Sequence, residues 1–156
     1  MSCAGGEETC DEEAAETRRP RESASTEEAE SALRVLIIDD EPQIGVTLKI
    51  LLRDHEVLVL SSGLEAQRAV AERPFDVILF DLTLRGLDGI EFEAWLRTEH
   101  PHLVPKLVLM TGGAYTEEAR SFVRGLPAQR HLSKPFTSKQ IESLLLSFKT
   151  SASVPR

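Results

Sequence analysis

The chain has 156 residues, of which 41% are hydrophobic and 28% are charged, and its formal net charge at pH 7 is −8. These values indicate one soluble globular domain of ordinary size. No run approaches the roughly 18 apolar residues of a membrane span, and the N-terminus MSCAGGEETC lacks the basic start and the apolar segment of a secretory signal. We therefore expect a cytoplasmic protein that does not enter a membrane.

The negative charge is concentrated at the N-terminus. Residues 1–32 contain ten acidic and three basic side chains, whereas the rest of the chain is nearly neutral. Such an acidic segment, with almost no large apolar residue, cannot bury enough surface to offset the entropy of ordering. We expect a disordered tail at 1–32 with Cys3 and Cys10 as reduced thiols, metal binding or lipidation being the alternatives. Since no basic stripe is present, no nucleic-acid partner is expected.

Five strand–helix pairs follow in chain order. Each consists of a short apolar strand and a segment with apolar residues at helical spacing or with helix start and stop signals. The strands are expected at 33–40, 56–60, 76–80, 106–110 and 130–133, and the helices within 41–54, 61–74, 87–101, 115–127 and 138–149. This alternation predicts an α/β fold with a doubly wound parallel sheet and helices on both faces. The predicted domain spans 33–149, and 150–156 is expected to form a short flexible C-terminus.

Polar residues at the carboxyl ends of the predicted strands form a candidate site. In a doubly wound sheet, ligands bind at this edge, near the switch in strand order. Strand one ends in an acidic pair, strand three in one acid, strand four in a threonine and strand five in Lys-Pro. These residues are Asp39, Asp40, Asp81, Thr111, Lys134 and Pro135. We expect them to converge from four separate strands.

The residue types at this edge suit phosphoryl chemistry. Three carboxylates close together repel one another, and a hard divalent cation such as Mg²⁺ resolves the repulsion. A lysine and a threonine hydroxyl opposite them suit an anion with distributed charge, such as a phosphoryl group. A carboxylate can also act as the nucleophile and form an acyl phosphate. Asp81 is the candidate nucleophile, because the apolar run VILF places it at the end of a central strand.

Four motifs carry a resemblance to a known family. IIDDEP, FDLTLRGLDGIE, LMTGG and SKPF, in this order and each after an apolar strand, resemble the signatures of the receiver domain of bacterial two-component response regulators. The resemblance extends from Leu33 to about Lys149. It implies a flavodoxin-like fold with five strands in the order 2-1-3-4-5.

The resemblance also implies a phosphoacceptor and a metal site. Asp81 would be the phosphoacceptor and would also bind Mg²⁺. Asp40 would be the principal acidic ligand of the metal, and Asp39 would contribute directly or through water. The backbone carbonyl of Thr83 would complete the protein ligands.

Further roles follow from the resemblance at the third and fourth motifs. Thr111 would hydrogen-bond the phosphoryl group and Lys134 would pair with it. A cis peptide bond before Pro135 would aim the lysine. His131 matches the position of the aromatic switch, where the family more often has Tyr or Phe. A histidine there adds sensitivity to pH, the alternative being a simple packed ring.

The expected partners also come from the resemblance. A histidine kinase or a histidine phosphotransfer protein would donate the phosphoryl group. The receiver would catalyse its own phosphorylation and dephosphorylation without being an enzyme for another substrate. A downstream protein would bind the face formed by the fourth helix, the fifth strand and the fifth helix, with the receiver as a monomer or as a phosphorylation-dependent dimer. Only seven residues follow Lys149 in this sequence, so we expect output by protein contact rather than by an attached domain.

Two departures and two alternatives accompany this interpretation. Arg85 stands where many receivers have proline, and Thr83 and Gly113 occupy positions that influence phosphoryl hydrolysis in the family. One alternative is a receiver-like module that binds proteins independently of phosphorylation. The other is a phosphatase of the haloacid dehalogenase type, which needs a second acid two residues after its nucleophile, where this chain has Thr83. The histidines that flank Pro101 are expected in a surface loop.

Overall fold

The computed structural model describes residues 32–113 and 116–152. The predicted disordered tail, with both cysteines, lies outside the described residues except for Ala32. Within the described part of the chain, no helix is long and apolar enough to cross a membrane.

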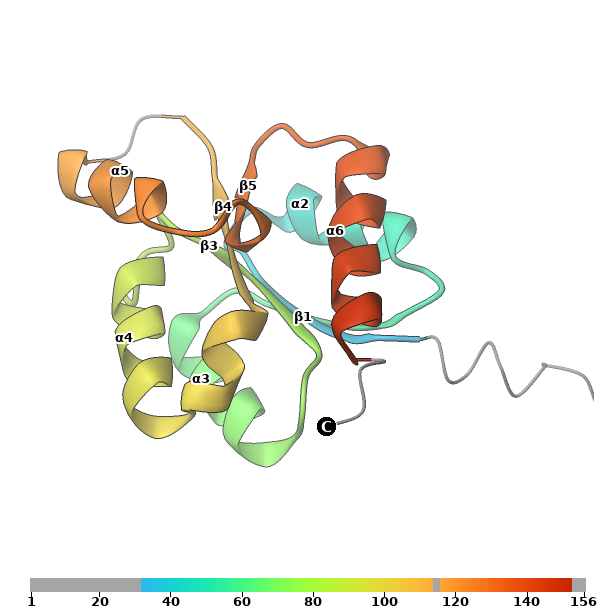
Figure 1. Cartoon of the computed structure of the whole chain (residues 1–156), viewed down its shortest axis with the longest axis horizontal. Coiled ribbons are helices and arrows are strands. Elements are labelled where there is room, and N and C mark those ends of the chain that lie inside the picture. Colours follow the sequence, from blue (N-terminus) through green and yellow to red (C-terminus); the bar gives the residue numbers. More distant parts are fainter. Residues whose placement is uncertain (1–31, 114–115, 153–156) are drawn as a thin grey trace, which may run out of the picture. The chain divides into compact units, whose positions relative to one another are not determined.

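The described residues form one sheet of five parallel strands (Figure 1). The strands are β1 (Arg34–Ile38), β2 (Glu56–Leu60), β3 (Val77–Asp81), β4 (Leu107–Thr111) and β5 (His131–Ser133). Their order is β2-β1-β3-β4-β5, as the resemblance implied. Each strand lies within one or two residues of the predicted segment. The apolar runs are long enough for strands and too short for typical helices, so their length distinguishes the strands from helices in the sequence.

The described residues also form five α-helices and two short 3₁₀ helices, all but the last of which lie between strands. They are α2 (Pro42–Leu51), α3 (Gly63–Glu72), α4 (Gly89–Glu99), η1 (Pro101–Lys106), α5 (Glu117–Arg124), η2 (Ala128–Arg130) and α6 (Ser138–Ala152). Helix α6 runs three residues past Lys149, where the predicted domain ends. The segment after α4, predicted as a loop, is the helix η1. A proline at its first position has a φ angle suited to a helical turn, and such short 3₁₀ stretches are common connectors.

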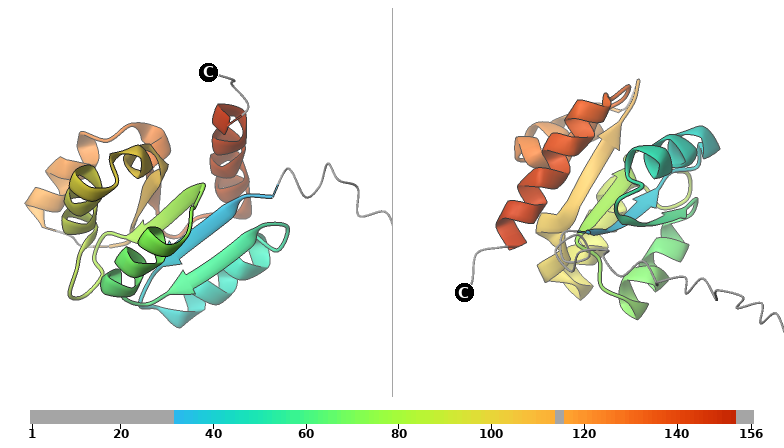
Figure 2. Two further views of the ribbon diagram at one scale, coloured as in Figure 1. Left: turned by 90° about the horizontal axis from the view of Figure 1, so that it is seen from below. Right: turned by 90° about the vertical axis from the view of Figure 1, so that its right-hand side faces the viewer.

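Helices cover both faces of the sheet (Figure 2). One apolar cluster lies on each face, between the sheet and these helices. Side chains alternate along a strand, so neighbouring residues of β1 point to opposite faces. Leu36 and Ile38 pack with buried residues of α3, α4 and α5, whereas Val35 and Ile37 pack with α2 and α6. All five residues of β3 and all five of β4 are buried. The central strands are therefore held rigidly between two helical layers, and so are the residues at their ends.

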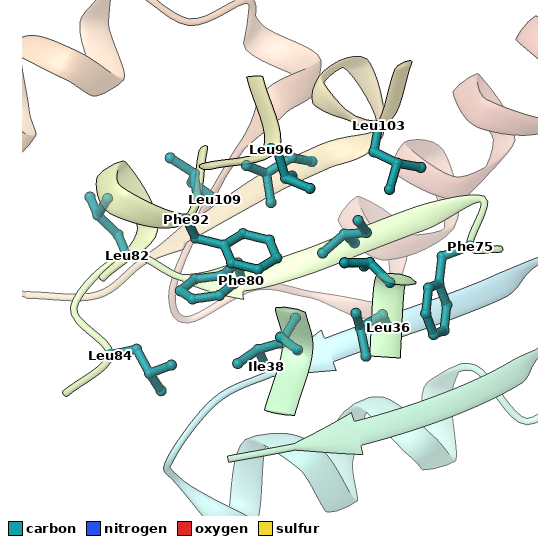
Figure 3. Packing of buried hydrophobic residues seen from close by; sticks show 14 of the residues in the cluster. Leu36, Ile38, Phe75, Phe80, Leu82, Leu84, Phe92, Leu96, Leu103 and Leu109 are labelled. Atoms are coloured by element: carbon teal, nitrogen blue, oxygen red, sulfur yellow. The ribbon is translucent and has the colours of Figure 1, made fainter. Parts of the chain in front are cut away.

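The connection from β3 to α4 is anchored at both ends. Phe80 of β3 stacks on Phe92 of α4 with ring centroids 4.4 Å apart, in the cluster that Figure 3 shows. At the start of α4, the Asp88 carboxylate accepts from the N–H groups of Ile90 and Glu91, and the Glu91 side chain accepts from the N–H of Asp88. This reciprocal capping box satisfies backbone donors that a helix start leaves open. The chain that follows Asp81 is thus fixed by packing on one side and by capping on the other.

Candidate functional site

The strand order brings the predicted residues to one edge of the sheet. Asp39 directly follows β1, Asp81 is the last residue of β3, Thr111 is the last residue of β4, and Lys134 directly follows β5. Strands β1, β3, β4 and β5 are consecutive neighbours in the sheet (Figure 1). The carboxyl ends of these parallel strands therefore meet at one edge, as the sequence predicted.

Three carboxylates gather at this edge. Asp39, Asp40 and Asp81 each offer an oxygen, and these atoms lie within 4.8 Å of one another. Within 32–113 and 116–152 this is the one group of three or more acidic, histidine or cysteine side chains that could hold a metal ion. Asp39 and Asp81 are each 3% exposed, whereas Asp40 is exposed. Carboxylate oxygens that reach solvent on one side suit a hard divalent cation that keeps part of its water shell.

The carboxylate of Asp81 is oriented by its own loop. The backbone N–H and the hydroxyl of Thr83 both donate to Oδ1 of Asp81, each at 3.1 Å. The other oxygen, Oδ2, lies 3.7 Å from Nζ of Lys134. The two oxygens of Asp81 therefore have different environments, and Oδ2 is the one that faces the cationic side chain.

Lys134 is the central cation of the site. Its ammonium lies 2.6 Å from Oδ2 of Asp39 and 3.7 Å from a carboxylate oxygen of Glu41, in addition to its contact with Asp81. The side chain is only 11% exposed. The peptide bond to Pro135 is cis, as the resemblance implied. Lys134, Asp39 and Asp81 thus share a nearly buried space, in which their interactions are stronger than in water, while the Glu41 side chain lies at its exposed rim.

The backbone next to Lys134 explains one glycine of the LMTGG motif. The N–H of Lys134 donates to the carbonyl of Thr111 at 2.6 Å, which draws the chain after β5 against the end of β4. A Cβ atom at Gly112 would lie 3.1 Å from both Cβ and Cδ of Lys134. This approach leaves little room for a side chain, so glycine permits the packing of the lysine stem.

Burial and pairing shift two pKa values at the site. Burial raises the pKa of Asp39 above its ordinary value, and the nearby Asp81 acts in the same direction, against the hydrogen bonds from Lys134 and from the N–H of Glu41. Burial alone would lower the pKa of Lys134. The hydrogen bond of the ammonium to Asp39 and the charges of the nearby carboxylates outweigh the effect of burial, so the pKa of Lys134 is raised. The raised pKa of Lys134 reflects the carboxylates around it, and a site with several carboxylates is one that a divalent cation binds favourably.

Thr111 and His131 are joined by a hydrogen bond. Oγ1 of Thr111 lies 2.8 Å from Nε2 of His131, and Thr111 is 4% exposed. The half-buried histidine has a pKa below its ordinary value because of burial. The residue at the predicted switch position therefore contacts the residue predicted to bind the phosphoryl group.

The sequence interpretation missed Glu41. Its N–H donates to Oδ1 of Asp39 at 2.9 Å, and its carboxylate is the third acidic neighbour of Lys134. The sequence feature that could have identified Glu41 is its position in the motif IIDDEP, directly before the proline with which α2 begins. Of the two noted departures, Arg85 is exposed, and Gly113 has a φ of +81°, which favours glycine.

A hollow of about 550 Å³ opens beside the carboxylates. It lies between the loop after β3 and the helices α4 and α5. Its lining includes Thr83, Asp88, Glu91, Thr116 and Glu118. Thr83 belongs both to this hollow and to the hydrogen bonds that orient Asp81, so the hollow adjoins the site.

Comparison with known proteins places these features in one family. The profile described as "Response regulator receiver domain" matches residues 35–146. The sensor histidine kinase GacS of Pseudomonas protegens is 28% identical over 135 residues, which is 83% of this chain and 14% of that protein. The transcriptional regulatory protein TcrA of Mycobacterium tuberculosis is 30% identical over 128 residues, which is 81% of this chain and 49% of that protein. The chain therefore spans half or less of the length of these relatives.

Solved structures agree in fold. A response regulator receiver domain protein from Clostridium thermocellum has a TM-score of 0.64 at 26% identity, covering 76% of this chain and 94% of that one. The receiver domain of the sensor histidine kinase PA1611 from Pseudomonas aeruginosa, solved with a magnesium ion in its active site cleft, has a TM-score of 0.63 at 22% identity, covering 76% and 98%. With the family profile spanning most of the described residues, the chain belongs to the response regulator receiver domain family of two-component systems.

Proposed function

We propose that Asp81 accepts a phosphoryl group from a histidine kinase or a histidine phosphotransfer protein, in a reaction that depends on Mg²⁺. The observation that carries this proposal is the convergence of three carboxylates with a nearly buried lysine and a threonine hydroxyl at the carboxyl edge of the sheet. The relatives support the same reaction class, because one is named as a sensor histidine kinase and another as a transcriptional regulatory protein.

The donor set fits the proposed metal. Asp39, Asp40 and Asp81 would hold Mg²⁺ through carboxylate oxygens, and the backbone carbonyl of Thr83 is the further ligand that we propose. The magnesium ion in the cleft of the PA1611 receiver is consistent with this assignment. When bound, Mg²⁺ supplies positive charge that offsets the carboxylates and the oxygens of the transferred group.

Each side chain of the site would then have a separate role in the phosphoryl transfer. The hydrogen bonds from Thr83 hold one oxygen of Asp81 and leave Oδ2 as the nucleophile. Oδ2 forms a bond to phosphorus while the P–N bond of the donor phosphohistidine breaks, and the electron pair of that bond returns to the donor imidazole. Lys134 would pair with one oxygen of the phosphoryl group and the Thr111 hydroxyl would donate to another.

Two surfaces support the proposed partners. Helix α2 begins two residues after Asp40 and exposes Val46 and Ile50, apolar side chains that a protein donor could cover.

We propose that a downstream protein binds the face formed by α5, β5 and α6, which are the fourth helix, the fifth strand and the fifth helix of the fold. It contains a groove of about 520 Å³ between β5 and α6 that His131 lines. Contact between His131 and Thr111 joins this face to the proposed phosphoryl site. We propose a monomer or a phosphorylation-dependent dimer.

Intact mass measurement tests the proposed function. The full chain is incubated with Mg²⁺ and acetyl phosphate, beside Asp81→Asn and beside a sample with EDTA. We expect one added phosphoryl group on the wild type and none in either control. An unmodified wild type that also fails to bind Mg²⁺ and beryllofluoride would contradict the proposal and favour a module that binds proteins independently of phosphorylation. An adduct that persists in Asp81→Asn would assign the acceptor to another residue.

A further inference from the structure

The contact between Thr111 and His131 has a defined geometry. His131 is paired in register with Leu109, two residues before Thr111 on β4. Because side chains alternate along a strand, Leu109 and Thr111 lie on the same face, and the imidazole reaches along this face to the hydroxyl. The distance of 2.8 Å from Nε2 to Oγ1 is that of a strong hydrogen bond, whereas Oγ of Ser133 is 3.5 Å from the same nitrogen. Thr111 is therefore the main hydrogen-bond partner of Nε2.

A hydroxyl has one proton, and this limits what Thr111 can do. When Nε2 of His131 carries no proton, it accepts the hydroxyl proton of Thr111, which is then not available to another acceptor. When Nε2 carries a proton, it donates to Oγ1, and the hydroxyl proton is free to point elsewhere. The imidazolium form always has a proton on Nε2, whereas the neutral ring has it in only one of its two tautomers.

We propose that His131 is a positioning residue that sets the direction of the Thr111 hydroxyl proton, and that protonation of His131 is thereby coupled to occupation of the phosphoryl site at Asp81. This inference rests on the proposed function, because it requires a phosphoryl group to which Thr111 donates. In the empty site the neutral ring accepts from Thr111. In the phosphorylated site the ring donates to Oγ1, and the hydroxyl donates to a phosphoryl oxygen. One chain of hydrogen bonds then joins β5 to the anion.

The surroundings of the ring allow it to titrate within this chain of hydrogen bonds. On η2, Arg130 is directed to the carbonyl of Leu107 and to Glu93 rather than to the imidazole. The other ionisable groups on the elements around β5 are Lys134 after the strand, Lys139, Glu142 and Lys149 on α6, and Glu117, Glu118, Arg120 and Arg124 on α5. Burial is the cause of the lowered pKa of His131, and no charged group among the described residues contributes to the shift. A ring held neutral by burial alone can be protonated when an anion arrives nearby.

Thermodynamic linkage gives the consequence in both directions. If the anion favours the protonated ring, the pKa of His131 rises when the site is filled, and the site binds the anion more tightly as the pH falls through the histidine range. The two effects must be equal, because coupling between two binding events is reciprocal. Each unit by which the His131 pKa rises corresponds to a tenfold increase in the affinity for the anion, or about 1.4 kcal/mol of binding free energy.

The test uses beryllofluoride, an analogue of the phosphoryl group that binds aspartate in the presence of Mg²⁺. NMR titration of the ring protons of the full chain, at saturating Mg²⁺ with and without beryllofluoride, measures the pKa of His131 in both states. The signal is assigned by its loss in His131→Phe. Beryllofluoride affinity is then measured across pH 5.5–8 for the wild type and for His131→Phe. We expect a higher His131 pKa in the filled site and a matching pH dependence of affinity that His131→Phe lacks.

A second variant separates the hydrogen-bond chain from the simple attraction of a nearby anion. Thr111→Val keeps the ring and the shape of the site but removes the hydroxyl. We expect the rise in the His131 pKa on beryllofluoride binding to be clearly smaller in this variant than in the wild type, even if His131→Phe does not fold. An equal rise in both proteins would overturn the proposal.

The outcomes also separate this inference from the proposed function. Beryllofluoride that binds the wild type without moving the His131 pKa, or with the same pH dependence in His131→Phe, would reject the coupling and leave the phosphoacceptor assignment standing. No binding to the wild type at any pH would overturn both.

Discussion

The ammonium of Lys134 and the carboxylate of Asp39 form the shortest ionic contact of the carboxylate edge, at 2.6 Å. The same lysine lies 3.7 Å from both Asp81 and Glu41. Lys134 thus places a positive charge against two of the three carboxylates at which we propose that Mg²⁺ binds. Its raised pKa keeps it charged over the physiological range. If Mg²⁺ binds as we propose, the lysine would compete with it for Asp39 and would change partners when the phosphoryl group arrives.

Replacement of Lys134 is expected to strengthen metal binding. Lys134→Met keeps the apolar stem and removes the charge, so Asp39 becomes free for the metal. A unit charge about 4 Å away contributes about 4 kcal/mol at an effective dielectric constant near 20. We expect the Mg²⁺ affinity to rise by at least about tenfold, or ~1.4 kcal/mol, in calorimetric titrations. Lys139→Met, at an exposed site on α6, is the matched control and should leave the affinity unchanged. Weaker Mg²⁺ binding in Lys134→Met would contradict this account.

At the scale of elements, a buried ion pair connects α4 to η2. Glu93 of α4 is 3% exposed and pairs closely with Arg97 one turn later. Its Oε1 also lies 3.7 Å from Nη2 of Arg130, while Nε of Arg130 donates to the carbonyl of Leu107 at 3.1 Å. Nη2 of Arg130 is buried and has no hydrogen-bond partner among the described residues. Glu93 is thus the countercharge for a guanidinium whose Nη2 is buried.

Loss of Glu93 is expected to destabilise the fold through Arg130. Glu93→Leu would leave the guanidinium buried without its countercharge, a change that costs about 3–5 kcal/mol for buried pairs. Adding Arg130→Met should recover part of this loss, with a coupling of about 0.5–3 kcal/mol in a double-mutant cycle measured by urea unfolding.

A matched control replaces the exposed partner of the same carboxylate. Arg97→Met removes a guanidinium that is 66% exposed, and we expect it to change the free energy of unfolding by no more than about 1 kcal/mol. Strict additivity of Glu93→Leu and Arg130→Met would show that the two side chains do not act as a pair.

At the scale of the whole molecule, two histidines couple stability to pH. Nδ1 of His55 accepts from the N–H of Leu33 at 3.1 Å, where the chain enters β1. Burial, with a smaller effect of Lys149, lowers the pKa of His55, and burial also lowers that of His131. Each folded-state pKa lies below the ordinary histidine value of 6.5. At these two residues the unfolded chain therefore binds protons that the folded chain resists, and their contribution to stability falls as the pH falls below about 6.5.

The contribution of His55 can be isolated with an acceptor that does not titrate. His55→Gln offers an amide oxygen to the N–H of Leu33 at every pH. We expect the free energy of unfolding of the wild type to fall more steeply than that of His55→Gln between pH 7 and pH 5, in urea unfolding curves. His131 and Asp39 are present in both proteins, so their effects cancel in the comparison. Equal slopes would show that His55 keeps its ordinary pKa in the folded state.

The local pattern of the sequence was sufficient to predict the sheet and the residues at its carboxyl edge. The runs before Asp39, Asp81 and Thr111 are each four apolar residues long, so they could be recognised without knowledge of the fold. Alternation with helices makes the strands parallel, and parallel strands place their carboxyl ends together. The η1 helix was not predicted, because short 3₁₀ segments have little periodicity and begin at a proline that also ends the preceding helix.

The contacts within the site were decided only by the tertiary structure. Lys134 and Asp39 are 95 residues apart in the chain, and their pairing depends on the register of four strands and on how each side chain turns. The bond between Thr111 and His131 and the burial of Glu93 depend on the same long-range packing. Short sequence patterns determine which residues lie at the carboxyl edge, because the end of a strand is a local feature. They do not determine which side-chain atoms are in contact, because those contacts depend on distances across the sheet.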